Sequence, residues 1–177
     1  ETGFDLKLFD NRLGLDLTYY TGNTQNQILS VPADIVTGYG NRIINAGKIT
    51  NKGVEAILSG TPVKNKNVEW NVMVNWSTNQ NRIVSLADNV EQQTLASLGG
   101  AWIGYIIATK GGTTSDLWGP KMIRDEKGNI INANGVPTYT STNEYIGRTT
   151  PDWKAGITNT VRYRNMRLTA TIDGQYK

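Results

Sequence analysis

Hydrophobic and polar residues alternate at every second position in several segments of this chain, and helical periodicity is nearly absent. The clearest example is residues 68–79, VEWNVMVNWSTN. Because successive side chains of a strand point to opposite faces, this pattern predicts a β-strand with two unlike faces. The apolar face carries Val68, Trp70, Val72, Val74 and Trp76, and the opposite face carries Glu69, Asn71, Met73, Asn75 and Ser77.

Six segments of this kind predict three antiparallel hairpins, because each pair is separated only by a short polar break. The pairs are residues 3–9 with 13–20, 53–60 with 68–79, and 152–164 with 167–177. The segments between the pairs, about residues 21–48 and 80–151, are long and are predicted to be loops. Loops of that length are unusual in compact soluble domains. Short turns on one rim and long loops on the other are typical of outer-membrane barrels, so the order predicts an antiparallel up-and-down transmembrane β-barrel segment.

Composition does not contradict a membrane barrel. The 177 residues have 38% hydrophobic content and a mean hydropathy of −0.41, which superficially resemble a soluble protein. Barrel strands expose only alternate residues to lipid, so average hydropathy does not detect them. No apolar run reaches the roughly 18 residues of a spanning helix, and no signal peptide is present. The first residue is Glu1, and we therefore expect the chain to lie inside a longer protein.

The absence of His and Cys removes the usual catalytic bases, thiolates, disulfides and zinc ligands. We therefore expect no enzyme, no cofactor and no metal site. The net charge of +3 comes from scattered basic residues, which argues against nucleic-acid binding. The segment KMIRDEKGNIIN, residues 121–132, predicts a small hairpin turning at Asp125–Asn129, with Gly128 supplying positive φ. A calcium loop is a weaker interpretation, because Lys127 occupies a position that needs an oxygen ligand.

Aromatic spacing supports a lipid-facing surface. Trp153 and Tyr163 share a face and lie ten positions apart. In a tilted strand this separation projects to about 25 Å, the height of the apolar band between aromatic girdles. Trp70 and Trp76 project to only about 15 Å, so they do not both mark an interface. Asn159 interrupts the apolar face, and aromatics also favour strands in general. Residues predicted to face the lumen are Glu55, Ser59, Glu69, Asn71, Asn75, Lys154, Thr158 and Arg162.

The sequences of several segments resemble those of the SusC/RagA family of TonB-linked (TonB-dependent) outer-membrane proteins. The first block is ETGFDLKLFDNRLGLDLTYYTGNTQNQILSVP, and the second is NAGKITNKGVEAILSGTPV. The strand WNVMVNWSTNQNRIVSL and the block GRTTPDWKAGITNTVRYRNMRLTATIDGQY resemble family segments as well. Together the blocks cover most of the chain except about residues 91–142, and their combination is specific.

The resemblance implies that residues 1–177 are part of one receptor β-barrel domain, with about six strands of a roughly 22-stranded barrel. It implies location in the outer membrane of a Gram-negative bacterium and import of nutrients, often oligosaccharides and sometimes peptides. The implied partners are a SusD-like surface lipoprotein, outer-membrane lipid, a glycan or peptide substrate, and the TonB complex, which would bind through parts absent from this chain. The chain shows no plug domain.

Five aromatic residues in the long segment are candidates for ligand binding, because sugar rings stack on aromatic side chains. They are Trp102, Tyr105, Trp118, Tyr139 and Tyr145. Packing among loops or contact with the lid lipoprotein is the alternative for each of them. The alternative for the whole chain is a soluble β-rich carbohydrate-binding or adhesion module, in which the apolar strand face would be a protein core.

Overall fold

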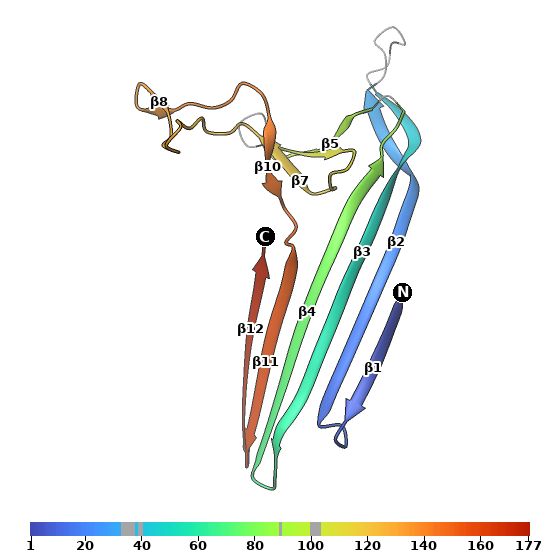
Figure 1. Cartoon of the computed structure of the whole chain (residues 1–177), viewed down its shortest axis with the longest axis vertical. Coiled ribbons are helices and arrows are strands. Elements are labelled where there is room, and N and C mark those ends of the chain that lie inside the picture. Colours follow the sequence, from blue (N-terminus) through green and yellow to red (C-terminus); the bar gives the residue numbers. More distant parts are fainter. Residues whose placement is uncertain (33–37, 39–40, 89, 100–103) are drawn as a thin grey trace. The chain divides into compact units, whose positions relative to one another are not determined.

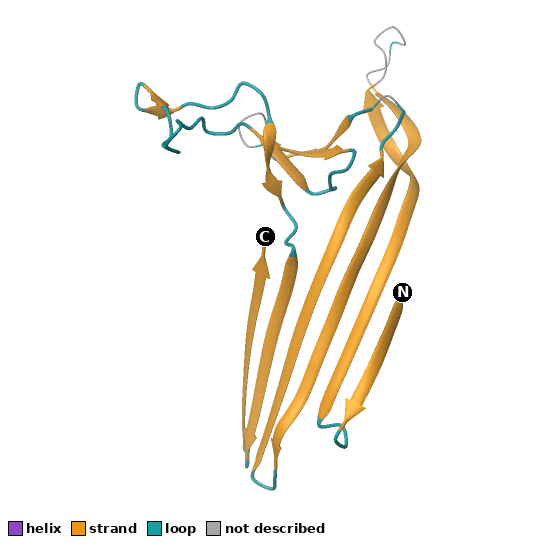
Figure 2. Cartoon of the chain, viewed as in Figure 1, coloured by secondary structure: helices purple, strands orange, loops and turns teal. Residues whose placement is uncertain are grey.

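The computed structural model describes residues 1–177 except 33–37, 39–40, 89 and 100–103 (Figure 1). The described residues form strands, turns and irregular segments, as Figure 2 shows. None of them belongs to a helix long and apolar enough to cross a membrane. The chain divides into two compact units. The first comprises Glu1–Gly22, Asn51–Gln80 and Pro151–Lys177, and the second comprises Asn23–Thr50 and Asn81–Thr150.

A six-stranded sheet with the order β1-β2-β3-β4-β11-β12 organises the first unit (Figure 1). Its strands are β1 (Thr2–Leu8), β2 (Leu13–Pro32), β3 (Asn41–Lys64), β4 (Val68–Ser85), β11 (Trp153–Tyr163) and β12 (Met166–Tyr176). The three predicted hairpins are confirmed, because β1 neighbours β2, β3 neighbours β4, and β11 neighbours β12. Strands β4 and β11 pair antiparallel without a register shift, which joins the last two hairpins into one sheet.

The register of this sheet collects the apolar residues of β4, β11 and β12 on one face. Directly opposite residues lie on the same face of a sheet, so apolar residues of adjacent strands line up in cross-strand rows. The apolar rows are Trp76–Ala155–Gly174, Val74–Ile157–Ile172, Trp70–Val161–Leu168 and Val68–Tyr163–Met166. The hairpin of β1 and β2 continues the pattern with the pairs Phe4–Leu17, Leu6–Leu15 and Leu8–Leu13.

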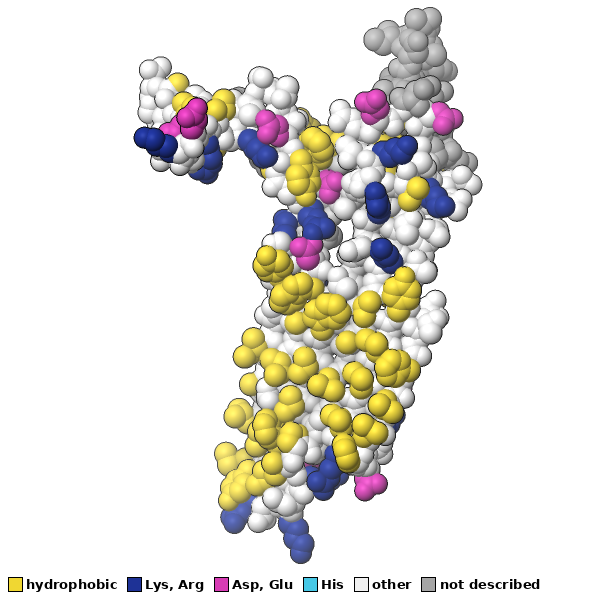
Figure 3. Space-filling model, in the orientation of Figure 1, with side chains coloured by type: hydrophobic (Ala, Val, Ile, Leu, Met, Phe, Trp, Pro, Cys, Tyr) yellow, Lys and Arg dark blue, Asp and Glu magenta, His cyan; other side chains and the backbone are white. Residues whose placement is uncertain are grey.

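The apolar face of this sheet is exposed. Leu168 and Ile172 are 71% and 70% exposed, and Figure 3 shows hydrophobic side chains gathered over the sheet. Among the described residues the buried hydrophobic ones are Ile83, Ala87, Ile107 and Ala108, which all belong to the second unit. The apolar face therefore does not pack into a protein core within the described chain, as a lipid-facing barrel wall requires.

The strands of the first hairpins run farther than the alternation predicts. Strand β2 continues to Pro32, β3 begins at Asn41, and β4 continues to Ser85. The predicted loop of residues 21–48 is therefore largely strand among its described residues. Backbone hydrogen bonds can extend a sheet through residues of any type. The segment from Thr21 to Gln27 is polar at nearly every position. A hydrophobic pattern gives no signal for strands of that kind.

The second unit contains a four-stranded antiparallel sheet with the order β10-β7-β6-β5. Its strands are β5 (Gln92–Ser97), β6 (Tyr105–Thr109), β7 (Asp116–Gly119) and β10 (Glu144–Arg148), and a separate two-stranded sheet consists of β8 (Asn132–Ala133) and β9 (Val136–Pro137). The predicted loop of residues 80–151 is therefore a small folded unit. Ile107 and Ala108 of β6 are buried within this unit.

Candidate functional site

Polar side chains on the face of the first unit's sheet opposite the apolar one form a hydrogen-bonded cluster. Arg162 Nη2 of β11 contacts Glu69 Oε2 of β4 at 2.9 Å. Asn71 Nδ2 donates to Glu69 Oε1 at 3.1 Å, and Thr61 Oγ1 donates to Asn71 Oδ1 at 2.8 Å. Alternation in both strands places these residues on the face that the sequence assigned to the lumen. These hydrogen bonds link β3, β4 and β11 across the predominantly polar face.

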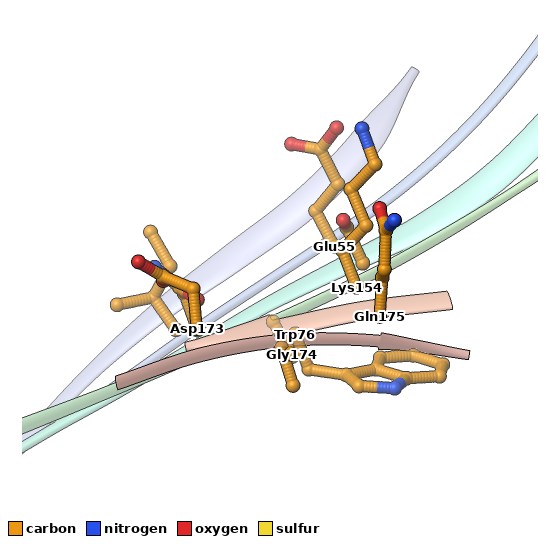
Figure 4. A pocket seen from close by; sticks show the side chains of 11 residues that line it. Glu55, Trp76, Lys154, Asp173, Gly174 and Gln175 are labelled. Carbon is orange, nitrogen blue, oxygen red and sulfur yellow. The ribbon is translucent and has the colours of Figure 1, made fainter. Parts of the chain in front are cut away.

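A groove of about 730 Å³ lies along this polar face (Figure 4). Glu55, Lys154 and Gln175 point away from the strands on the same side, whereas the Trp76 indole lies on the other side of the sheet. Neither Glu55 nor Lys154 has an ion pair within 4.0 Å among the described residues. The groove is lined by Glu55, Ala56, Ile57, Asn75, Trp76, Ser77, Lys154, Ala155, Asp173, Gly174 and Gln175.

Gly156 leaves space for two side chains that line the groove. A Cβ atom at Gly156 would lie 2.4 Å from Asp173 Oδ1 and 2.7 Å from Asn75 Oδ1. Any larger residue would displace both side chains, because such separations are far below van der Waals contact. The groove can therefore present carboxylate, amide and ammonium groups to a polar ligand or to another polar surface.

The second unit brings three of the predicted aromatic residues into one row. Tyr105 of β6 pairs with Trp118 of β7, and Trp118 pairs with Tyr145 of β10. The rings of Trp118 and Tyr145 have centroids 6.0 Å apart and an interplanar angle of 74°. We call Tyr105, Trp118 and Tyr145 the aromatic row. A row of rings across adjacent strands is suited to stacking against apolar ring faces.

Local backbone requirements fix the aromatic row. Gly104 has φ of +125°, and a Cβ atom there would lie 2.7 Å from the Trp118 carbonyl oxygen. A register shift between Tyr145 and Gly147 marks a bulge immediately beside the row. The Trp118 Nε1 atom is buried and has no hydrogen-bond partner among the described residues. A ligand would therefore meet the ring surfaces of this row rather than that indole N–H.

The other two predicted aromatics do not belong to the row. Tyr139 forms an isolated bridge with Met122 and is 39% exposed. It lies in the segment of residues 121–140, which contains the predicted hairpin. Trp102 lies outside the described residues. The sequence identified the row's members individually, but their alignment depends on strand register and could not be read from spacing.

The predicted turn at Asp125 to Asn129 is confirmed. Asp125 Oδ1 accepts hydrogen bonds from the backbone N–H groups of Lys127 at 2.9 Å and Asn129 at 2.8 Å, and Asn129 Nδ2 donates to Oδ2 at 3.0 Å. Gly128 has φ of +86°. The Asn129 side-chain hydrogen bond, with help from backbone N–H groups, lowers the pKa of Asp125 below its ordinary value. Both carboxylate oxygens are thus engaged in shaping the turn.

Aromatic residues lie at both ends of β11 on the apolar face. Trp153 stacks on Tyr176 of β12, with ring centroids 5.9 Å apart and an interplanar angle of 16°. Tyr163 at the other end lies beneath Arg164, whose Cζ is 5.4 Å from the ring centroid. Between them, Trp70 Nε1 donates to Asn159 Oδ1 at 3.3 Å. This bond accounts for Asn159, the polar residue that interrupts the apolar face of β11. Neither the bond nor the stacking of Tyr176 was predicted from the sequence.

Comparison with known proteins identifies the family of this architecture. The sequence matches the family model described as "TonB dependent receptor-like, beta-barrel" over residues 1–176. TonB-dependent receptor P3 of Formosa agariphila is 30% identical over 95% of this chain and 19% of its own length. TonB-dependent receptor P26 of the same organism is 25% identical over 98% of this chain and 19% of its own length. The chain thus spans about a fifth of these two curated relatives.

Solved structures show the same fold. The structure of the RagAB peptide transporter has a TM-score of 0.73 and 22% identity, covering 97% of this chain and 20% of that chain. The RagAB peptide importer in the "open-open" state has a TM-score of 0.76 and 20% identity, covering 98% of this chain and 19% of that one. With its all-β antiparallel architecture and its family match over nearly every residue, the chain belongs to the TonB-dependent receptor β-barrel family.

Proposed function

We propose that this chain forms part of the wall and loops of a TonB-dependent outer-membrane transporter that imports nutrients into a Gram-negative bacterium. The observation that carries the proposal is the two-faced sheet, exposed and apolar on one side and polar with a groove on the other. In a barrel wall the apolar face would contact lipid and the polar face would contact an aqueous or plugged lumen, so each face would have an environment of matching polarity. The curated relatives are receptors of this family, which favours transport over catalysis.

The first unit supplies the membrane wall in this proposal. Trp153 and Tyr163 mark the two interfaces of the apolar band, and Tyr176 reinforces the first of them by stacking on Trp153. The polar groove around Glu55 and Lys154 faces the interior of the barrel. Energy coupling requires contact with the TonB complex, which we assign to parts of the transporter outside this chain.

The second unit supplies substrate contacts in this proposal. Its aromatic row, together with Tyr139 and Trp102, meets an oligosaccharide or peptide and the surface of a SusD-like lipoprotein that covers the extracellular mouth. Two RagAB structures with the same fold are described as a peptide transporter or importer, which supports a peptide as one substrate class. Stacking on aromatic rings is equally suited to the apolar faces of pyranose rings.

Single substitutions in the aromatic row test the substrate contacts. In an intact transporter containing this chain, Tyr145→Ala is expected to weaken substrate binding by about 2- to 10-fold, which corresponds to the loss of one aromatic contact. Tyr145→Phe, which keeps the ring, is the matched control and should bind as the wild type does. Calorimetric titration with panels of oligosaccharides and peptides gives the affinities. Unchanged affinity in Tyr105→Ala, Trp118→Ala and Tyr145→Ala would remove the row from the substrate site.

A further inference from the structure

Two hairpin turns at one end of the first unit's sheet form a basic cluster. The backbone N–H of Arg164, in the turn between β11 and β12, donates to the Asn67 carbonyl oxygen, in the turn between β3 and β4, at 2.8 Å. Lys66 and Arg164 therefore belong to adjoining turns, and Lys64 is the last residue of β3 before the first of them. No Asp or Glu occurs in residues 61–68 or 156–172. Glu69, the next acidic residue after the first turn, is already paired with Arg162.

The Arg164 guanidinium lies at the border of the apolar face. Its Cζ is 5.4 Å from the centroid of the Tyr163 ring, and Tyr163 belongs to the apolar row that includes Met166. Neither Lys66 nor Arg164 has a carboxylate partner within 4.0 Å among the described residues. Figure 3 shows several separate Lys and Arg side chains, with an acidic side chain beside them, at the lower end of the sheet where the hydrophobic surface stops. Unpaired cations thus adjoin an exposed apolar surface.

The apolar surface beside the cluster has room for an acyl chain. Met166 is 74% exposed and Leu168 is 71% exposed. They lie in successive apolar rows starting at the turn, because Met166 pairs with Tyr163 and Leu168 pairs with Val161. A cation at the end of such a strip matches a lipid, whose charged headgroup and hydrocarbon tail are joined in the same order.

We propose that Arg164 and Lys66 form a binding site for the phosphate diester of an anionic phospholipid, with its acyl chain on Met166 and Leu168. The inference rests on the proposed membrane location. Short turns of outer-membrane barrels lie at the periplasmic rim, so the ligand is a phospholipid of the periplasmic leaflet. The Arg guanidinium offers paired donors to phosphate oxygens, and its contact with Tyr163 holds it at headgroup level.

Arg167 provides a matched control at the same rim. It pairs in register with Arg162, whose partner Glu69 is on the polar face, so Arg167 also belongs to the polar face. Removing its charge changes the net charge of the rim by the same amount as removing that of Arg164. Only the variant on the apolar face should alter lipid binding.

Native mass spectrometry of the intact transporter, released from nanodiscs of mixed phosphatidylcholine and phosphatidylglycerol, tests the site. The wild type is expected to retain phosphatidylglycerol preferentially. Arg164→Gln and Lys66→Gln should each reduce that preference by about fivefold, and Arg167→Gln should leave it unchanged. Adding inorganic phosphate should not displace the lipid, because the acyl chain contributes to binding.

Several outcomes would overturn the proposal. They are equal retention of both lipids by the wild type, an equal loss in Arg167→Gln, or full displacement by inorganic phosphate, which would indicate a simple anion site. Each can occur in a protein that inserts in the nanodisc and imports its substrate, and then only the lipid site fails. A protein that remains in solution without detergent or lipid would instead contradict the proposed membrane function.

Discussion

The two units of this chain differ in whether they bury hydrophobic residues. In the first unit Leu168 and Ile172 are more than two-thirds exposed on a face that is apolar across several strands. In the second unit Ile83, Ile107 and Ala108 are buried, although Ile28 and Ile43 of the same unit are 76% and 75% exposed. Among the described residues the second unit therefore has a small hydrophobic core, and the first has none.

Average hydropathy carries little information about such a chain. The strands of the first unit mix polar and apolar residues because each strand has two unlike faces. The mean hydropathy of −0.41 for the whole chain therefore does not reveal an exposed apolar face. Strand register and exposure distinguish the two units, because they show where the apolar residues collect.

The largest expected effect comes from a charge on the apolar face of the first unit. Ile157 lies in the central row between Val74 and Ile172, so Ile157→Arg would place a guanidinium near the middle of the hydrocarbon region. Such substitutions in barrels cost about 2–4 kcal/mol. Reversible unfolding of the intact transporter in lipid vesicles, monitored by its electrophoretic shift, measures the change.

The neighbouring residue supplies the control for this substitution. Thr158→Arg introduces the same side chain one position along β11, on the polar face that carries Arg162. It should change the free energy of unfolding much less than Ile157→Arg does. If the two variants were equally destabilised, the assignment of the two faces to lipid and lumen would be incorrect.

A smaller but local effect is expected in the second unit. Asp116 is 6% exposed and accepts hydrogen bonds from Thr113, whose backbone N–H lies 2.9 Å from Oδ2. Asp116→Ala leaves that part-buried donor without its partner, at a cost of about 1–3 kcal/mol. Amide hydrogen exchange should increase in residues 104–119, while the exchange of β11 and β12 stays unchanged. Faster exchange throughout both units would show that they do not respond independently. Asp116→Asn, which keeps an acceptor oxygen, is the control.

The hydrogen bond from Trp70 to Asn159 gives a weaker test within the apolar face. Asn159→Val removes the acceptor of the Trp70 Nε1 proton, and Trp70→Phe removes the donor. Side-chain hydrogen bonds in membranes average about 0.6 kcal/mol. We expect each single variant to lose stability, and the double variant to lose less than the sum of the two. Strict additivity in this double-mutant cycle would mean that the two side chains do not interact.

The smallest expected effect concerns pH and the Asp125 turn. Hydrogen bonding to Asn129 lowers the pKa of Asp125 below its ordinary value of 3.8. The ionised carboxylate therefore stabilises the turn fully above that ordinary value, and the contribution is lost as the pH falls through the folded-state pKa. Amide exchange at Lys127 and Asn129, corrected for intrinsic rates, should increase at low pH. Asp125→Asn should show no comparable pH dependence, and an identical dependence in both proteins would exclude Asp125 as its source.

Sequence patterns predicted the parts of the fold that follow from local rules. Alternation located the three hairpins, and the Asp125 turn followed from the position of Gly128. The extensions of β2, β3 and β4 were not predicted, because their few apolar residues include adjacent pairs such as Ile43-Ile44 and Ile83-Val84, which break a period of two. Such a strand forms because it hydrogen-bonds to adjacent strands of the sheet, and local sequence does not show which strands will be adjacent.

In the candidate sites the residue types could likewise be predicted from the sequence, whereas their spatial arrangement could not. Tyr105, Trp118 and Tyr145 were chosen for their ring chemistry, which a sequence displays directly. Their alignment across three strands depends on the register of β6, β7 and β10, and a bulge beside Tyr145 alters that register. The Asn159 contact likewise joins residues 89 positions apart. Such pairings require long-range strand register and cannot be inferred from local spacing.

Site-directed spin labelling along β11 can show directly which face of the strand meets lipid and which meets water. The chain contains no cysteine, so single cysteines at positions 153 to 163 can carry the label in a transporter freed of any others. Collision rates with lipid-soluble oxygen and with a water-soluble nickel chelate would be measured in vesicles. We predict that the collision rates alternate with a period of two. Collisions with oxygen should be the more frequent at Ala155, Ile157 and Val161, and collisions with the nickel chelate at Lys154 and Thr158. Equal accessibility on both faces, or the opposite phase, would contradict it.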